Sequence, residues 1–390
     1  MSLPKFTRAF LNLTDACNLR CRYCFVKWQN NYMSYETAKT AADMLIDNAA
    51  ETGAKCDITF FGGEPLLMWD KVIKPLIAYI RNERESKCGL SITTNGTLLT
   101  EEMMQYMKAN RVGLLFSIDG HKELQDYNRP TAAGGSSFDL LTENVDKIVE
   151  YFPDVIFRST IIPETCRHTW EAIQFAIDHG YKTFFTTPNI FEPWSDEARA
   201  VLTEQIHKYS EYFVDCYRNG IKPIVFNTME RLMRRVKDIN SAAKLGKHRT
   251  MYYCTACGKC GLGAGTSCSI APNGDIYTCQ EMPSNAGCGS VFHVGSIYTG
   301  VDDAKRQALT DSYDPLKARG GNCEECKYNR ICDGGCAANN YMINGDIHIN
   351  AEAYCWWLQM LLGEIEWIIK TLGEERNEQF REYWAVINRG

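Results

Sequence analysis

The run LTDACNLRCRYCF, residues 13–25, directly follows the first apolar segment of the chain and contains Cys17, Cys21 and Cys24. The spacing of these cysteines suits three irons of a cubane iron-sulfur cluster and leaves the fourth iron without a protein ligand. Ordinary electron-transfer clusters are closed by four thiolates, and an open position marks a catalytic metal, as it does for zinc. The run therefore predicts a cluster at which a small molecule binds and is reduced.

Apolar runs alternate with longer amphipathic segments from Phe6 to about Asn219, which is the pattern of a parallel sheet or barrel. We expect strands at residues 8–13, 57–60, 90–93, 113–118, 155–161 and 183–187. Helices are expected between them, at residues 35–50, 72–85, 101–109, 138–151 and 168–179. These strand-helix units are fewer than the eight that close a full barrel. The predicted fold class is therefore α/β, with a partial, open (β/α)6 TIM-like barrel that admits a large substrate.

The cysteine run follows the first expected strand directly. It therefore lies at the carboxyl end of the predicted sheet, where the loops after strands gather catalytic groups. Its position in the barrel agrees with a chemical role for the cluster.

The 390 residues are 45% hydrophobic and 23% charged, as in a globular protein with a large core and more than one domain. No stretch approaches the ~18 consecutive apolar residues of a membrane span, and residues 1–8 lack the apolar core of a signal peptide. We therefore expect a cytoplasmic protein without a membrane partner. The net charge of -6 is spread along the chain, which argues against nucleic acid as a partner.

The 18 cysteines are unevenly distributed, and ten of them lie between Cys254 and Cys336. In a cytosolic enzyme such a concentration more often indicates metal than disulfides. The thiols scattered over the stretch before Cys254 are interpreted as buried and inert: Cys56, Cys88, Cys166 and Cys216.

The chain divides into three predicted parts. Residues 1–225 form the barrel, residues 226–250 are a polar, basic linker, and residues 251–390 form a cysteine-rich domain. This second domain is expected to contain a small β-hairpin and helices. Residues 352–384, rich in Trp and Leu, are expected to form its terminal helical segment.

The cysteine run resembles the signature of the radical S-adenosylmethionine (SAM) enzymes, both in its Cys17-x3-Cys21-x2-Cys24 spacing and in the aromatic Tyr23. After the second expected strand comes the segment GGEP, residues 62–65, which is similar to the family's motif for the methionine amino group. Two glycines let backbone approach a ligand, and a carboxylate receives an ammonium group. The resemblance implies that SAM binds the open iron.

Further segments follow in the order of the family pattern. The segment TNG, residues 94–96, ends the third expected strand, and SIDG, residues 117–120, ends the fourth. Arg158 on the fifth strand resembles the residue that meets the methionine carboxylate. The resemblance thus implies this set of SAM-binding residues: Gly62, Gly63, Glu64, Asn95, Ser117, Asp119 and Arg158.

A second resemblance covers Cys254 to Cys355 and is more specific. The run Cys323-x2-Cys326-x5-Cys332-x3-Cys336, followed by Cys355, is similar to the SPASM extension, which carries two auxiliary [4Fe-4S] clusters. Upstream, Cys260-x13-Gly274-x4-Cys279 matches the other half of that pattern. The resemblance implies three [4Fe-4S] clusters in all, with these auxiliary ligand sets: Cys323, Cys326, Cys332 and Cys355 for the distal cluster, and Cys260, Cys279 and Cys336 for the nearer one.

The fourth ligand of the nearer cluster is open at this point. Cys254 stands before Cys260 as in sulfatase-maturing relatives and is the preferred candidate. Cys257, Cys268 or an open iron are the alternatives, and the spacing of Cys254, Cys257 and Cys260 alone is also that of a ferredoxin-like run.

Simpler interpretations exist for each motif. Three cysteines can belong to a structural zinc site, but such a site needs a fourth nearby Cys or His, and the closest histidine in sequence is His121. A zinc knuckle is more credible for the run from Cys323 to Cys336 taken alone. The seven histidines show no metal pairing in the sequence, and the following are assigned to surface or core positions on helices: His168, His179 and His207.

The chemistry implied by the resemblance is a one-electron reduction of SAM to methionine and a 5′-deoxyadenosyl radical, which abstracts a hydrogen atom from the substrate. The auxiliary clusters offer a route for removing a second electron. SPASM-bearing enzymes commonly act on peptide or protein side chains. The predicted function is therefore maturation of a ribosomally synthesised peptide by an oxidative modification such as a thioether or carbon-carbon crosslink.

Two alternatives remain. Anaerobic sulfatase maturation, which converts Ser or Cys to formylglycine, is the first. In those enzymes an aspartate proposed as base follows the cysteine equivalent to Cys279, whereas this chain has Gln280 and then Glu281. The second alternative is a non-catalytic iron-sulfur electron carrier or redox sensor, which has no need of the glycine motif.

Partners are implied only by class: a peptide or protein substrate and a reductant such as flavodoxin or ferredoxin. Peptide-modifying relatives often bear an N-terminal leader-recognition domain of about 80 residues. We expect none here, because the first strand begins within about ten residues, so a separate leader-binding protein is an option. The sequence assigns no general base, oligomeric state, substrate or bond formed.

Overall fold

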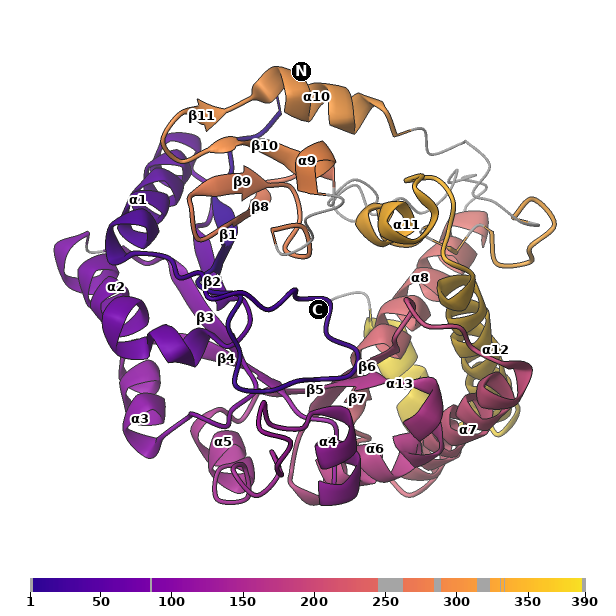
Figure 1. The fold of residues 1–390 in the computed structure, drawn as a ribbon. Coiled ribbons are helices and arrows are strands. Elements are labelled where there is room, and N and C mark those ends of the chain that lie inside the picture. Colours follow the sequence, from indigo (N-terminus) through magenta and orange to yellow (C-terminus); the bar gives the residue numbers. More distant parts are fainter. Residues whose placement is uncertain are drawn as a thin grey trace.

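The computed structural model describes residues 3–84, 86–244, 262–283, 289–313, 323–329, 331–332 and 334–387. Its strands form one curved sheet with helices on the outer side (Figure 1). The first seven strands are parallel neighbours in chain order: β1 (Arg8–Asn12), β2 (Asp57–Phe61), β3 (Gly89–Thr94), β4 (Val112–Ser117), β5 (Ile156–Ile161), β6 (Thr183–Pro188) and the short β7 (Val225–Phe226). The fold class predicted from the sequence is confirmed.

Helices connect these strands along the outside of the ring. They are α1 (Tyr35–Thr52), α2 (Lys74–Ala78), α3 (Glu101–Ala109), α4 (Lys122–Asn128), α5 (Val145–Tyr151), α6 (Thr169–Asp178) and α7 (Asp196–Arg218). The helix expected at residues 72–85 is instead a short α2 between two π-helical turns, Trp69–Ile73 and Tyr79–Glu83. The helix expected from residue 138 begins only at Val145.

The alternation of side chains along the strands separates the core from the barrel interior. Ile58, Phe60, Ile92 and Phe157 point outward into the hydrophobic core beneath the helices, where burial of apolar side chains supplies most of the folding free energy. Their neighbours in the strands, among them Arg158, are only partly buried. The side chains that face the barrel interior are therefore more polar than those that face the helices.

The expected linker at residues 226–250 is helical in its described part. Helix α8 spans Asn227–Lys244, and its side chains Met229, Leu232 and Met233 are 2%, 3% and 1% exposed. These apolar positions three and four residues apart form one buried helix face, which the polar, basic composition of the segment concealed. This helix was not predicted from the sequence.

The cysteine-rich region joins the same sheet. Strand β8 (Ser267–Ile270) pairs with β1 in parallel, and β9 (Asp275–Tyr277), β10 (His293–Ser296) and β11 (Gly300–Val301) continue from it with antiparallel pairing. The expected β-hairpin is thus an extension of the barrel sheet rather than a separate unit. The buried Arg306 strengthens this junction, because its guanidinium donates to the carbonyl oxygens of Pro4, Gly263 and Gly265.

The remaining helices are α9 (Gly289–Phe292), α10 (Asp303–Asp311), α11 (Ala337–Asn344), α12 (Glu352–Glu374) and α13 (Glu378–Val386). The last two replace the single terminal segment expected at residues 352–384. In Figure 1, α12 runs beside α7 and α8 and closes the side of the ring beyond β7. Within the described ranges, no helix has the length and apolar character needed to cross a membrane.

Two of the cysteines interpreted as scattered lie side by side. The Sγ atoms of Cys56 and Cys88, which precede β2 and β3, are 2.8 Å apart. Cys166 and Cys216 are buried, as expected. Cys88 is also buried, whereas Cys56 is only partly buried, so the prediction of burial holds for three of these four thiols.

Candidate functional site

The loop between β1 and α1 carries Cys17, Cys21 and Cys24, and it lies inside the ring of strands in Figure 1. All three thiols are partly buried. The backbone amide of Leu19 lies 3.4 Å from Cys17 Sγ, and the amide of Cys24 donates to the Cys21 carbonyl at 3.1 Å. The loop thus brings three thiols together at the carboxyl edge of the sheet.

Burial changes the protonation of these thiols. It raises the pKa of Cys17 to about 11 and that of Cys21 to about 12, and it also raises the pKa of Cys24. The thiols therefore keep their protons at neutral pH in the absence of a bound cation. Because a metal binds the thiolate, iron must displace these protons when it enters.

The glycine motif packs directly against the cysteine loop. The amide of Gly63 donates to Thr14 O at 2.7 Å, and the amide of Glu64 donates to Ala16 O at 2.9 Å. Gly62 has φ +133°, and a Cβ there would lie 2.3 Å from Thr14 O. A Cβ on Gly63 would lie 2.2 Å from Ala16 O. Only glycine permits this contact between the two loops.

The carboxylate of Glu64 is fully buried, with 0% of the residue exposed. It accepts hydrogen bonds from Leu66 N at 2.9 Å, Thr94 Oγ1 at 2.8 Å and Asn95 N at 2.9 Å. Burial raises its pKa to about 7, while these three donors lower it. The sequence predicted that this carboxylate receives an ammonium group. In the structure its three hydrogen bonds join the glycine loop to the end of β3.

Asn95 lies between the end of β3 and the cysteine loop. Its Nδ2 donates to Asn18 Oδ1 at 2.9 Å and lies 3.9 Å from Cys17 Sγ. Its Oδ1 accepts from Thr97 N and Oγ1 at 3.0 and 2.7 Å. Of the residues predicted to bind SAM, Asn95 is thus one that contacts the cysteine loop through its side chain.

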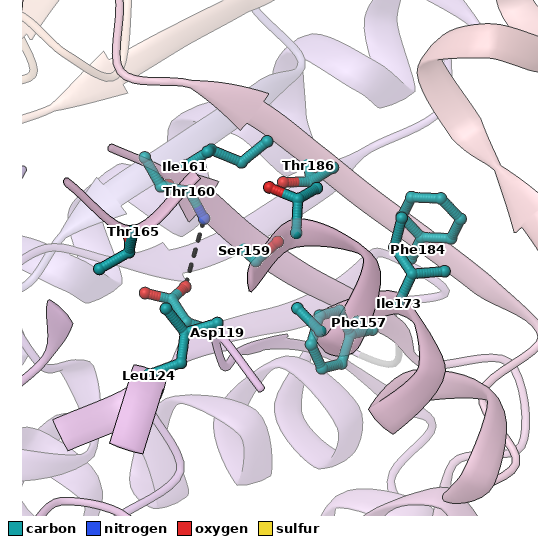
Figure 2. Close-up of a pocket in the computed structure, with 12 residues that line it drawn as sticks. Asp119, Leu124, Phe157, Ser159, Thr160, Ile161, Thr165, Ile173, Phe184 and Thr186 are labelled. Carbon is teal, nitrogen blue, oxygen red and sulfur yellow. Dashed lines mark hydrogen bonds between the residues drawn. The ribbon is translucent and has the colours of Figure 1, made fainter. Parts of the chain in front are cut away.

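Asp119 is 1% exposed and joins four elements at the end of β4. Its carboxylate accepts from Tyr23 OH at 2.7 Å, Asn128 Nδ2 at 3.0 Å and Thr160 N at 3.2 Å. It also forms an ion pair with Arg129 Nε at 3.1 Å. Figure 2 shows the bond to Thr160 at the edge of a small pocket between β5, β6 and α6. Asp119 therefore positions the loop that carries Cys24.

No motif in the sequence indicated Arg129 as a residue of the site. Its side chain is 8% exposed and lies over the Tyr23 ring, 5.2 Å from the centroid. Burial lowers the pKa of its guanidinium, but the interactions with the Asp119 carboxylate, Tyr23 and Cys21 outweigh that effect and raise it. Arg129 directly follows α4 and precedes Pro130, and this position is only a weak signal in the sequence. The fold, rather than a local motif, brings Arg129 beneath the cysteine loop.

Ser117 and Arg158 are paired in register on β4 and β5, so their side chains lie on the same face of the sheet. The Arg158 guanidinium lies 5.1 Å from the centroid of the Phe185 ring. Burial and the charge of Arg129 lower its pKa, whereas the charge of Glu281 raises it. Burial also raises the pKa of Glu281. A partly buried cation and a partly buried carboxyl group therefore lie near each other.

The auxiliary cysteines that the structure describes fall into two neighbourhoods. The thiol of Cys355, at the start of α12, has Cys323 and Cys326 as electrostatic neighbours. The amide of Gly334 donates to Cys332 Sγ at 3.3 Å. Cys279 and Cys336 both pack against a separate apolar cluster that includes Leu262 and Phe292. Cys254 and Cys260, and the alternative Cys257, lie outside the described residues.

Cys268 is a structural thiol. It is 1% exposed on β8, and its Sγ lies 3.6 Å from the carbonyl oxygen of Arg8 on β1. Burial raises its pKa to about 12. Because Cys268 belongs to the main core and Cys279 to the separate apolar cluster, the structure gives no support to Cys268 as the missing ligand.

Residues 11–176 match the model of the Radical SAM superfamily. These residues form a radical SAM domain. The cysteine-type anaerobic sulfatase-maturating enzyme of Clostridium perfringens (strain 13 / Type A) is 19% identical over 345 residues, which cover 86% of this chain and 89% of that enzyme.

Solved structures agree with this assignment of the fold. Native anSMEcpe with bound AdoMet superimposes with a TM-score of 0.70 at 18% identity, over 94% of this chain and 99% of that one. SuiB of Streptococcus suis, bound to the precursor peptide SuiA, superimposes with a TM-score of 0.61 at 15% identity, over 91% of this chain and 76% of that one. The predicted resemblance to the radical SAM family is confirmed.

The residues present fit the [4Fe-4S] cluster that a radical SAM domain implies. Three thiols of one loop face the edge of the sheet and carry the soft sulfur donors that iron-sulfur clusters require. Among the described residues, no three cysteine thiols lie within 4.8 Å of one another. Within the part of the chain that the structure describes, the cysteine run therefore does not stand out as a compact site for a single metal ion.

Proposed function

We propose that this chain is a radical SAM maturase that starts an oxidative modification of a peptide or protein residue by removing a hydrogen atom. The observation that carries the proposal is the direct contact between the cysteine loop and the glycine loop, at the open edge of a polar barrel interior. When bound, the cluster and SAM supply a hydrogen-abstracting radical after one-electron reduction. The chain's own residues supply position and shelter from water.

Each residue at the edge of the sheet has a proposed role. Cys17, Cys21 and Cys24 hold the cluster, and Asn95 sets the direction of the Cys17 sulfur. The backbone of the glycine loop, rather than the Glu64 carboxylate, faces the ammonium group of SAM. Arg158 supplies a positive charge for the carboxylate of SAM. Ser117, which pairs in register with Arg158, places a hydroxyl group beside it. Asp119 acts indirectly, since its carboxylate already holds Tyr23 and Arg129.

The auxiliary cysteines are proposed to hold two further [4Fe-4S] clusters. Cys323, Cys326, Cys332 and Cys355 would bind the distal one, which the proximity of Cys355 to Cys323 and Cys326 supports. Cys279 and Cys336, which share one apolar cluster, would contribute to the nearer one with Cys260 and Cys254. These clusters would accept the electron that the substrate loses.

Two reactions are consistent with this site. Crosslinking of a ribosomally synthesised peptide is one, and SuiB, solved with its precursor peptide, supports a peptide substrate. Formylglycine formation is the other, supported by the sulfatase-maturating relative that matches most of this chain. In this chain Gln280 follows Cys279, and the next residue is Glu281, whose partly buried carboxyl group lies near Arg158. The identity of the peptide or protein substrate would distinguish between these two reactions.

A peptide assay separates the two reactions. The reconstituted enzyme is incubated anaerobically with SAM, dithionite and either a sulfatase-derived peptide containing Cys or Ser, or a small cysteine-containing peptide encoded beside the gene. Mass spectrometry then identifies the product. A crosslink in the encoded peptide supports peptide maturation, and an aldehyde in the sulfatase peptide supports sulfatase maturation. If SAM is cleaved and neither peptide changes, the proposal of a peptide or protein substrate fails.

The proposal includes a protein reductant such as flavodoxin or ferredoxin and, for a peptide with a leader segment, a separate leader-binding protein. The carrier or sensor alternative predicts cluster reduction without SAM cleavage. The contact between the glycine loop and the cysteine loop favours the enzyme, because an electron carrier needs no backbone surface for a ligand beside its cluster.

A further inference from the structure

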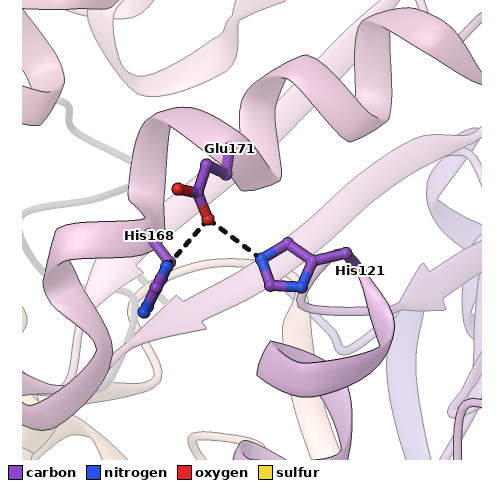
Figure 3. Close-up of side chains that lie close together, drawn as sticks. All are labelled: His121, His168 and Glu171. Carbon is purple, nitrogen blue, oxygen red and sulfur yellow. Dashed lines mark hydrogen bonds and ion pairs between the residues drawn. The ribbon is translucent and has the colours of Figure 1, made fainter.

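Two histidines and a glutamate meet where the turn after β4 lies beside the start of α6 (Figure 3). Glu171 Oε2 lies 3.1 Å from His121 Nε2 and 2.8 Å from His168 Nδ1. The three donor atoms all lie within 4.8 Å of one another. The sequence predicted no metal pairing among the histidines, and the fold brings these two together across 47 positions.

The two carboxylates beside His121 restrict which tautomer its neutral ring can adopt. Its Nδ1 lies 3.0 Å from Glu123 Oε2, while its Nε2 faces Glu171. A neutral imidazole has one N–H donor, so it cannot donate to both carboxylates. When Nδ1–H donates to Glu123, the lone pair of Nε2 points at the Glu171 oxygen, and a cation between them removes the repulsion. A carboxylate on the second ring nitrogen is also the usual arrangement around a metal-binding histidine.

The backbone holds these donors in place. His121 is the residue before α4, and His168 and Glu171 lie at the start of α6, three residues apart on the same side. Gly120 packs against α6, because a Cβ on it would lie 3.2 Å from the Cα atom of Ala172. The two imidazole rings are edge to face, with centroids 5.8 Å apart. Packing of the turn on α6, rather than the hydrogen bonds alone, sets the approach of the donors.

We propose that His121 Nε2, His168 Nδ1 and the Glu171 carboxylate form a binding site for one divalent transition-metal ion, with zinc as the reference metal and water completing the coordination. Two imidazoles and one carboxylate are an established donor set for zinc, with bonds of about 2.0–2.2 Å. In a tetrahedron with such bonds the donors lie about 3.3–3.6 Å apart, so the observed separations of 3.1 and 2.8 Å would lengthen by roughly half an ångström to admit the ion. The site is separate from the cysteines and does not depend on the proposed reaction.

The metal would join the turn after β4 to helix α6. His121 stands two residues after Asp119, whose carboxylate holds Tyr23 and Arg129 beneath the cysteine loop. A metal bound by His121 and Glu171 would restrict the movement of that turn. The role is therefore structural.

The test is zinc binding to the anaerobically reconstituted holoenzyme, whose cluster-binding cysteines are occupied by iron. His168→Gln and Glu171→Gln each remove one donor without changing the fold of α6. His179→Gln is the matched control, because His179 follows the same helix and pairs with a single carboxylate, Asp146. Zinc stoichiometry and affinity are measured for all four proteins, together with the zinc K-edge absorption spectrum of the wild type.

We expect one zinc ion on the wild type and on His179→Gln, with nitrogen and oxygen neighbours and no sulfur in the spectrum. Affinity should fall at least about tenfold in His168→Gln and Glu171→Gln. Equal binding by all four proteins, a sulfur neighbour around zinc, or no zinc on the wild type would overturn the proposal. Circular dichroism of the zinc-free variants checks that each one is folded.

Discussion

The hydroxyl of Tyr23 donates to the Asp119 carboxylate at 2.7 Å. This bond joins the residue before Cys24 to the end of β4, two segments 96 residues apart in the chain. The same carboxylate pairs with Arg129, whose guanidinium lies over the Tyr23 ring. The cysteine loop is therefore held by a buried polar network, in addition to its backbone contacts with the glycine loop.

Replacement of Tyr23 by Phe tests the network. The ring and its contact with Arg129 remain, but one oxygen of the Asp119 carboxylate loses a donor. We expect the free energy of unfolding to fall by about 1–3 kcal/mol, and cluster iron to be lost faster under chelator challenge. Tyr127→Phe is the control, because the Tyr127 side chain is exposed over Arg22. Equal iron loss in both variants would show that the bond does not hold the loop.

Replacement of Gly62 by Ala tests the contact between the two loops. The new Cβ would meet the Thr14 carbonyl at 2.3 Å in a backbone conformation of φ +133°. We expect a destabilisation of about 3 kcal/mol or more, with a fall in bound iron after reconstitution. Gly53 also has a positive φ, +68°, but no atom lies within 4 Å of a Cβ built on it, so Gly53→Ala should cost only about 1–2 kcal/mol. A similar loss of stability and iron in both variants would refute the account of the clash.

Replacement of Glu64 by Gln tests the role assigned to that carboxylate. An amide NH2 would face at least one of the three donors that now surround the two oxygens. We expect a loss of about 1–3 kcal/mol in the free energy of unfolding, measured by denaturant titration. If the carboxylate were instead free to receive SAM, stability would be unchanged and only SAM affinity, measured by equilibrium dialysis, would fall.

Replacement of Arg129 by Met tests the buried ion pair. The variant leaves Asp119 charged and buried, and we expect a destabilisation of about 3–5 kcal/mol. The double variant with Asp119→Asn should recover part of this loss, because it removes the unpaired charge. Thermal unfolding of the two single variants and the double variant measures the coupling, and strict additivity of the two changes would contradict a direct interaction.

Much of the fold was predictable because the strands are buried and regular. The strand at 8–13 is β1, Arg8–Asn12, and the helix at 101–109 is α3 with the same bounds. Helix α8 was missed because one buried face, made by Met229, Leu232 and Met233, is hidden among basic residues. Periodicity at those positions was the available signal.

The site was only partly predictable for a physical reason. Motif spacing places Cys17, Gly62 and Asn95 on successive loops, and these loops do meet. The sequence does not contain the information that Arg129 turns inward beneath Tyr23, or that His121 meets Glu171. Such contacts depend on how helices pack on the sheet, and they join residues that no local pattern connects.

The central claim is that the loop with Cys17, Cys21 and Cys24 supports reductive cleavage of SAM. The most direct test measures 5′-deoxyadenosine by chromatography after the reconstituted enzyme is mixed anaerobically with SAM and dithionite. The wild type and the control Cys216→Ala, whose buried thiol lies on α7, should both form it, and Cys17→Ala should form none. No 5′-deoxyadenosine from a wild type whose clusters are fully reduced, or equal amounts from Cys17→Ala, would contradict the account.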